Sequence, residues 1–307
     1  MHLRRPISIE KPVMNLAELF SLAAIWGASF LFMRIGAPEF GPVPLIALRV
    51  GIAALVLFPV LRSAVARNHL RSKLWPMLVV GVTNSALPFS LFAYSTLYVN
   101  AGFDAVLNAT VPLWTGLIAF VWLKSPMSRP QVIGMLVGMV GVVVLVWDKI
   151  GEGQPGVWLA TAAVLLATLS YGFAINYSKT RLAGVPPFVV ACGSQLAATL
   201  VLLPLALIYW PAAAVSSTAW YSVLALGVLC TGVAYVIFYR LLDRVGSAYA
   251  ASVTFLIPIF GVIWGAIFLK EQVTLGMVFG CLIILLGTAL ATGKLNLSNY
   301  LRAKSNE

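Results

Sequence analysis

The chain has 307 residues, of which 61% are hydrophobic and only 9% are charged. A soluble globular domain has about 45–50% apolar and about 25% charged residues, so this composition excludes that class. The formal net charge of +11 would suit a nucleic-acid-binding protein, but the basic residues lie in short segments that separate long apolar runs. That distribution argues against a nucleic-acid surface and indicates contact with anionic lipid.

Ten apolar segments of membrane-spanning length follow one another along the chain. About 20 apolar residues cross the hydrocarbon core of a bilayer, which is about 30 Å thick. We expect spans at residues 16–36, 44–61, 74–97, 103–123, 131–147, 157–178, 187–209, 219–240, 247–269 and 274–292. Because these spans fill nearly the whole chain, the sequence predicts an all-α integral membrane protein with no soluble domain.

The basic residues predict the orientation of the spans. With the N-terminus inside the cell, nearly all basic residues outside the spans fall in inner segments, and only Lys149 and Lys270 fall in outer loops. The positive-inside rule therefore predicts that both termini are cytoplasmic. We expect Ser63 and Asn296 on the cytoplasmic side and Gly153 outside.

The second half of the chain repeats the first. The pair Trp26-Gly27 returns as Tyr171-Gly172 after 145 residues, and Pro112 returns as Pro258 after 146 residues. A repeat with an odd number of helices must insert upside down relative to its twin. We therefore expect ten transmembrane helices as two inverted five-helix repeats, an architecture by which many transporters expose one midplane site to either side in turn. The expected repeats are residues 1–150 and 151–307.

Polar and aromatic side chains within the spans predict a solute-binding site. Polar groups at membrane depth are costly unless they line a cavity or pair with one another. An alternative for each residue is packing or hydrogen bonding between helices. The candidate binding residues are Trp26, Ser29, Asn84, Asn108, Tyr171, Gln195, Tyr235 and Thr254. Such a lining suits small solutes with a polar head and an apolar body, such as neutral or aromatic amino acids.

Charged residues near the span ends are candidate gates. Arg34 and Lys179 are equivalent in the two repeats and fall at opposite mouths, where gates would form with Glu39 or Asp104 outside and with Asp243 inside. Interfacial snorkelling is the alternative for them. Arg49 lies within the second span, where it would pair with Asp104, snorkel outward or accept a substrate carboxylate.

Proline and glycine predict the shapes and contacts of the helices. Pro88, Pro112 and Pro258 are expected to kink their spans, because proline removes a backbone donor. Glycine stripes in the fifth and tenth spans allow close helix approach, either within the fold or in a homodimer. The oligomeric state is therefore open between a monomer and a homodimer.

Two segments resemble the two copies of the drug/metabolite transporter (EamA-type) domain. They are residues 94–146, around AVLNATVPLWTGLIAFVWL, and 239–290, around AASVTFLIPIFGVIWGAIFLKEQVTLG. The family pattern has small and polar residues, then proline, then an apolar run ending in Leu/Lys-Glu, then a helix opened by glycine. Glu271 keeps the family's glutamate in the second half, whereas Ser125 stands there in the first.

The resemblance implies a secondary transporter, often an exporter of amino acids or other small metabolites, and we expect it in a bacterial inner membrane. The sequence shows no ATP-binding loop, no cluster of metal-ligating residues and no catalytic pair, so we expect no cofactor and no enzyme activity. No acidic residue occupies the middle of a span, which favours transport without a proton gradient. The alternatives are a proton-coupled carrier that uses Asp104 and an integral-membrane enzyme or scaffold.

Overall fold

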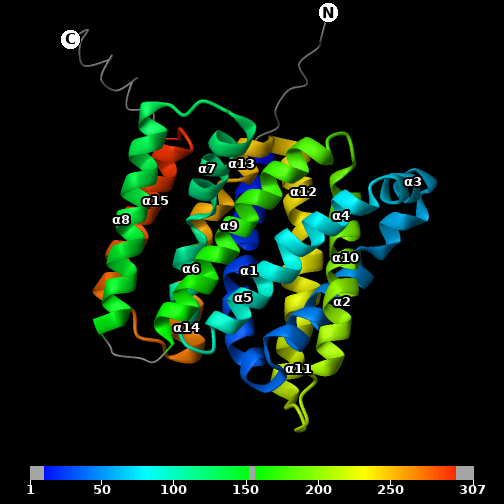
Figure 1. Cartoon of the computed structure of the whole chain (residues 1–307), viewed down its shortest axis with the longest axis horizontal. Helices are drawn as coiled ribbons and strands as arrows, with labels where there is room; N and C mark the ends of the chain where they lie inside the picture. The colour runs from blue at the N-terminus through cyan, green and yellow to red at the C-terminus, as the bar shows by residue number, and fades with distance from the viewer. Residues whose placement is uncertain (1–9, 152–155, 295–307) are drawn as a thin grey trace, which may run out of the picture.

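The computed structural model describes residues 10–151 and 156–294, which form a bundle of long helices (Figure 1). The first half comprises α1 (Glu10–Phe40), α2 (Pro42–Leu57), η1 (Phe58–Arg62), α3 (Ala64–Ser72), α4 (Leu74–Gly81), η2 (Val82–Ala86), α5 (Leu87–Ser95), α6 (Ala101–Asn108), α7 (Val111–Leu123) and α8 (Arg129–Gly151). The second half comprises α9 (Val157–Arg181), α10 (Pro187–Ile208), α11 (Ser217–Leu224), η3 (Ala225–Val233), α12 (Ala234–Val245), α13 (Ser247–Ala250), α14 (Val253–Leu269) and α15 (Leu275–Ala291).

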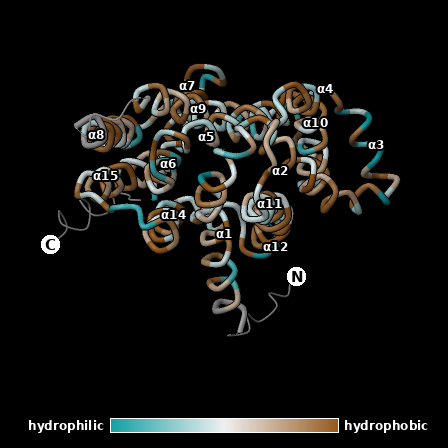
Figure 2. Tube along the Cα trace, turned by 90° about the horizontal axis from the view of Figure 1, so that it is seen from below, coloured by the Kyte–Doolittle hydropathy of each residue, from teal (hydrophilic) through white to brown (hydrophobic). Residues whose placement is uncertain are grey.

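The described residues have the architecture of an integral membrane protein. Eight helical stretches among them are long and apolar enough to cross a membrane, and α14 and α15 are shorter apolar helices. These ten agree with the ten spans predicted, and no strand occurs in this part of the chain. One helix, α3, is not predicted from the sequence; it is short, carries hydrophilic residues and lies at the edge of the bundle (Figure 2).

The two halves pack through equivalent helix pairs. α1 crosses α14 at Gly27, where a Cβ atom would lie 2.7 Å from the Phe260 Cβ. α9 crosses α7 at Gly172, where a Cβ atom would lie 3.0 Å from the Trp114 Cβ. The repeat relates Gly27 to Gly172 and Trp114 to Phe260. The first helix of each half therefore lies against the fourth helix of the other half, as inverted repeats require.

The last helices of the two halves, α8 and α15, stand together at one side of the bundle (Figure 1). Gly134 of α8 faces the backbone of α15, and a Cβ atom there would lie 2.6 Å from the Gly287 carbonyl oxygen. A Cβ atom on Gly141 would lie 2.7 Å from the Ile284 nitrogen. The glycine stripes thus serve a close contact within the chain.

Pro112 and Pro258 are equivalent in sequence but differ in local geometry. Pro112 stands in the first turn of α7, directly after the break at residues 109–110 that separates α6 from α7. Pro258 lies inside α14, and the break in that span falls earlier, at residues 251–252. Proline is well tolerated in a first turn, whereas inside a helix it frees the carbonyl four residues earlier. The two prolines therefore stand at different places relative to the breaks in their spans, and the kinks remain a prediction.

The two ends of the bundle can be told apart in Figure 1. α11 and the start of α6 lie at one end, which we call the α11 end; α13 and the start of α1 lie at the other, the α13 end. In the predicted orientation the α11 end is outside the cell and the α13 end is in the cytoplasm. Gly153 is predicted to lie outside the cell and Asn296 in the cytoplasm, but both fall outside the described residues.

Candidate substrate site

A cavity of about 280 Å³ lies between the two halves, with helices of both halves in its wall. Its volume is near the lower end of the range of about 300–1,000 Å³ found for small-molecule sites. Seven of the eight candidate binding residues contribute to the wall, namely Trp26, Ser29, Asn84, Asn108, Tyr171, Tyr235 and Thr254. The structure therefore brings together residues that are far apart in the sequence.

Aromatic rings form much of the apolar wall. Trp26 of α1 packs on Phe238 of α12, with 5.4 Å between ring centroids. Tyr171 of α9 stacks on Phe92 of α5, with 6.1 Å between centroids. Trp26 and Tyr171, which the repeat relates, thus reach the cavity from opposite halves. Such a wall suits the apolar body of a small solute.

Two π-helical segments present polar side chains to the cavity. η2 carries Asn84 and Ser85, and η3 carries Cys230 and Thr231, their equivalents 146 residues later. π-helical turns are rare and often occur at functional sites. Pro88 stands two residues after the end of η2 and has no N–H for the carbonyl four residues earlier, which favours the altered hydrogen bonding there. Only the first half has this proline, so only there does the sequence indicate altered helical hydrogen bonding.

Arg49 of α2 and Gln195 of α10 make similar hydrogen bonds from the two halves. Arg49 Nε donates to Thr231 Oγ1 at 3.0 Å, and Gln195 Nε2 donates to Ser85 Oγ at 2.9 Å. The acceptors Ser85 and Thr231 are equivalent in the repeat, whereas the donors stand one position apart, because Ser194 is the equivalent of Arg49. Arg49 lines the cavity, whereas Gln195 is fully buried outside its wall. Gln195, a candidate binding residue, instead holds α10 against η2.

Arg49 does not pair with Asp104 in the structure. Its guanidinium lies over the Phe89 ring, with 3.7 Å from Cζ to the ring centroid, and its Nη1 lies 3.7 Å from the Met33 sulfur. Asp104 is buried elsewhere, in α6, where its Oδ1 accepts a hydrogen bond from Ser95 at 2.7 Å. In the described part of the chain, Arg49 has no ion-pair partner.

A carboxylate closes the bundle at the α11 end. Glu271 follows α14 and accepts hydrogen bonds from the N–H groups of Ala101 at 2.9 Å and Gly102 at 3.3 Å. These N–H groups begin α6 and have no partner within their own helix, so they attract an anion. A left-handed residue at Lys270, with φ of 55°, turns Glu271 back toward the bundle. We call this contact the Glu271 latch.

Among the described residues, Arg34 forms no ion pair with Glu39 or Asp104, the partners expected at its mouth. Arg34 Nη1 donates to the Thr96 carbonyl, just beyond α5. Glu39, a possible partner of Arg34, accepts hydrogen bonds from the nitrogen and the hydroxyl of Ser216 at 2.6 and 2.7 Å. Each charged side chain therefore bonds to backbone or hydroxyl groups near a neighbouring span. The sequence alone does not show which groups these are.

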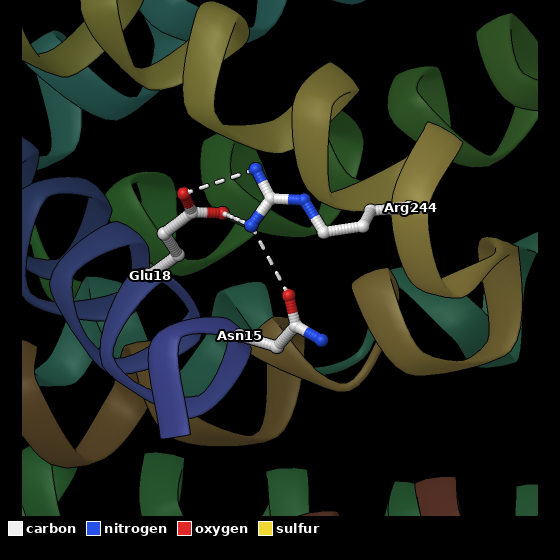
Figure 3. Close-up of polar contacts among 3 residues, drawn as sticks. All are labelled: Asn15, Glu18 and Arg244. Carbon is white, nitrogen blue, oxygen red and sulfur yellow. Dashed lines mark hydrogen bonds and ion pairs between the residues drawn. The ribbon is translucent and has the colours of Figure 1, made fainter. Parts of the chain in front are cut away.

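A charged contact joins α1 to α12 at the α13 end (Figure 3). Arg244 Nη1 lies 3.3 Å from Glu18 Oε2 and donates to Asn15 Oδ1 at 3.2 Å. This contact is not predicted from the sequence, because its two charges come from opposite halves of the chain and no spacing links them. Lys179 and Asp243, the candidates at this mouth, are exposed instead.

The two ends of the cavity are unequally closed. Every residue of α6 from Ala101 to Leu107 is buried, including Ala105. Ala251, the equivalent of Ala105 at the α13 end, is exposed. Ser125, the equivalent of Glu271, is exposed as well and offers no carboxylate to α13. The structure is therefore more tightly closed at the α11 end than at the α13 end.

Ten membrane helices in two inverted halves, with a cavity between them, define a membrane transport protein. No group of three His, Cys, Asp or Glu side chains in the described residues is placed to hold a metal ion. The chain belongs to the EamA-like transporter family, which matches residues 16–147 and 158–293. This confirms the resemblance seen in the sequence.

Relatives across the family have transporter names. The uncharacterized transporter YoaV of Bacillus subtilis (strain 168) is 24% identical over 284 residues, which are 89% of this chain and 95% of that protein. The probable amino-acid metabolite efflux pump of Escherichia coli (strain K12) is 25% identical over 288 residues, 87% of this chain and 90% of that protein. A crystal structure with 19% identity has a TM-score of 0.65 and covers 92% of this chain and 99% of its own, which supports the fold. The family and these relatives indicate a transporter rather than an enzyme.

Proposed function

We propose that the protein exports small amphiphilic metabolites, amino acids or related solutes, by alternating access to the central cavity. The observation that carries the proposal is the unequal closure of two ends that the repeat makes equivalent. In a carrier built from inverted repeats, one half adopts at one face the arrangement that the other half adopts at the opposite face. A structure latched at the α11 end and unlatched at the α13 end therefore represents one of two alternating states.

The cavity wall suggests how a solute is held. Trp26 and Tyr171 offer flat apolar surfaces from the two halves, and Asn84 and Asn108 offer amide groups for a polar head. Small-molecule sites commonly combine an apolar wall with a few placed polar groups. The relative from Escherichia coli named as an amino-acid metabolite efflux pump supports the direction and the solute class.

The orientation completes the proposal. We place the protein in a bacterial inner membrane with both termini in the cytoplasm, so that the less tightly closed α13 end faces the cytoplasm. A solute then enters from inside the cell, and it leaves when the α11 end opens and the Glu271 latch separates. Both movements use the same cavity, with no second site required.

Efflux from loaded proteoliposomes tests the proposal. We expect labelled neutral or aromatic amino acids to leave vesicles that contain the protein, and Trp26→Ala and Asn108→Ala each to slow efflux by about tenfold or more while the protein stays folded. The matched control is Trp158→Ala, because Trp158 of α9 is 67% exposed and lies outside the cavity wall. Normal efflux by both cavity variants would place the site elsewhere.

One observation favours a second candidate, a proton-coupled carrier. Asp104 is fully buried at the closed end, and its Oδ2 has no hydrogen-bond partner among the described residues. A buried carboxylate with a free oxygen is a natural position for proton uptake during a conformational change. The two candidates differ in whether solute movement carries protons.

A further inference from the structure

The cavity contains one charged group, and it is positive. Arg49 is 3% exposed and lines the wall, and no Asp or Glu belongs to the described lining. A guanidinium has five N–H groups and remains protonated in proteins. Thr231 accepts from one of them, and the Met33 sulfur is a weak acceptor for another. Most of the N–H groups of Arg49 therefore have no acceptor among the described residues.

The second half of the chain shows that the fold does not need this charge. Ser194 is the equivalent of Arg49 in α10, and the neighbouring Gln195 makes the corresponding hydrogen bond, to Ser85, with a neutral amide. Contact between the second helix of one half and the π-helical segment of the other is therefore achieved without a cation. The positive charge in the first half requires another explanation, since an unpaired arginine within the membrane is expensive.

The geometry around Arg49 suits an anion. Phe89 lies over one part of the guanidinium and Thr231 fixes its Nε, so the side chain is held in one orientation. Arginine binds carboxylates through two parallel hydrogen bonds, and such bonds are stronger than those between neutral groups. Trp26 and Tyr171 line the same cavity and offer contact to an apolar body.

We propose that Arg49 is the anion-binding group of the cavity and that the preferred solutes are amphiphilic monocarboxylates without an ammonium group. This inference rests on the proposed function and narrows the class of solutes that the protein would export. A zwitterionic amino acid presents the same carboxylate, but its ammonium group meets no acidic side chain in the described wall. A solute with a net negative charge neutralises the positive charge of Arg49, whereas a solute with a net positive charge adds a second unpaired charge to the cavity.

Three probes of nearly the same shape separate these cases. They are 3-phenylpropionate, with a carboxylate alone, L-phenylalanine, with both charges, and L-phenylalaninamide, with an ammonium alone. Ligands that bind the native state raise the unfolding temperature of a purified protein. We expect 3-phenylpropionate to bind the unaltered protein most tightly, and phenylalaninamide at least about tenfold more weakly.

Arg49→Gln is the matched variant, because it supplies the neutral side chain that makes the corresponding hydrogen bond in the second half. We expect it to lower the affinity for 3-phenylpropionate by about tenfold or more and to remove the order among the three probes. Arg49→Lys, which keeps the charge but loses the planar fork, should restore part of the preference.

Three outcomes would overturn the inference. They are equal binding of 3-phenylpropionate and phenylalaninamide to the unaltered protein, unchanged binding of 3-phenylpropionate by the Arg49→Gln variant, and no binding of the carboxylate at all. The first and third need no variant, so a failure of Arg49→Gln to fold leaves the test intact. Efflux measurements separate this inference from the proposed function. A protein that moves solutes of either charge equally would refute the anion preference alone, whereas one that binds carboxylates and moves none would refute transport alone.

Discussion

Replacing Glu271 by glutamine should loosen the closed α11 end. The substitution keeps the shape of the side chain and one acceptor oxygen, but it removes the charge that faces the start of α6. The N–H groups of Ala101 and Gly102 would then compete for a single neutral acceptor. We expect the equilibrium between the two states of the carrier to shift toward opening at this end.

The magnitude follows from the two hydrogen bonds of the latch. A hydrogen bond to a charged group contributes about 1.5–3 kcal/mol, against about 0.5–1.5 kcal/mol for a neutral one. An anion at a helix N-terminus contributes about 0.3–1 kcal/mol more. Losing the charge should therefore cost the closed state about 1–3 kcal/mol, which is a change of about 5- to 150-fold in the equilibrium between the states.

Cysteine labelling measures this shift. Ala105 is fully buried at the closed end, and its equivalent Ala251 is exposed at the α13 end. In a protein without its three native cysteines, an Ala105→Cys residue should react slowly with an external thiol reagent, and Glu271→Gln should accelerate the reaction at least about fivefold.

The symmetric substitution Ser125→Glu supplies the control. It places a carboxylate at the α13 end, where the structure has none, and should slow the labelling of an Ala251→Cys residue. If Glu271→Gln leaves the labelling of position 105 unchanged while position 251 reacts normally, then the latch does not hold the α11 end closed.

Three further expectations concern coupling, packing and topology. Since no acidic side chain lines the described cavity, efflux should continue when the proton gradient is collapsed; solute-dependent proton flux that Asp104→Asn abolishes would favour the proton-coupled candidate instead. Gly287→Leu should lower the stability by about 1–3 kcal/mol or more in thermal unfolding, because it forces a side chain into the backbone of α8, whereas the lipid-facing Leu286→Ala should change it little. A cysteine at Ser63 should react with reagent from the cytoplasmic side, and reaction from outside alone would reverse the proposed orientation.

The sequence predicts the helices well because each span is long and apolar, which is a local property of the chain. It also predicts several polar and aromatic residues of the cavity wall, since residues such as Asn108 and Tyr171 have few acceptable positions within a bilayer. The repeat adds information that a single span lacks. Trp26 and Tyr171, for example, are expected to reach one site from opposite halves because the repeat relates them.

Partners of polar groups are harder to predict, because they depend on contacts between distant spans. Arg49 has Thr231 as its partner and Gln195 has Ser85, and in both cases the acceptor sits on a π-helical segment with little local signal. α3 escapes prediction because it is short and polar. Glu271 is visible as a family residue, but its contact with α6 depends on the backbone turn that precedes it.

A latch at only one end has a kinetic consequence for a carrier with a single site. It leaves the final distribution of an uncoupled solute unchanged, because both faces share the same binding contacts. It does change the fraction of empty carriers that are open to each face. The apparent dissociation constant at a face equals the intrinsic dissociation constant divided by the fraction of carriers open to that face. With Glu271 at one end and Ser125 at the other, half-saturation is expected at a lower solute concentration on the face at the α13 end than on the face at the α11 end. One side chain can thus give a duplicated protein a preferred direction in rate, although neither half has one alone.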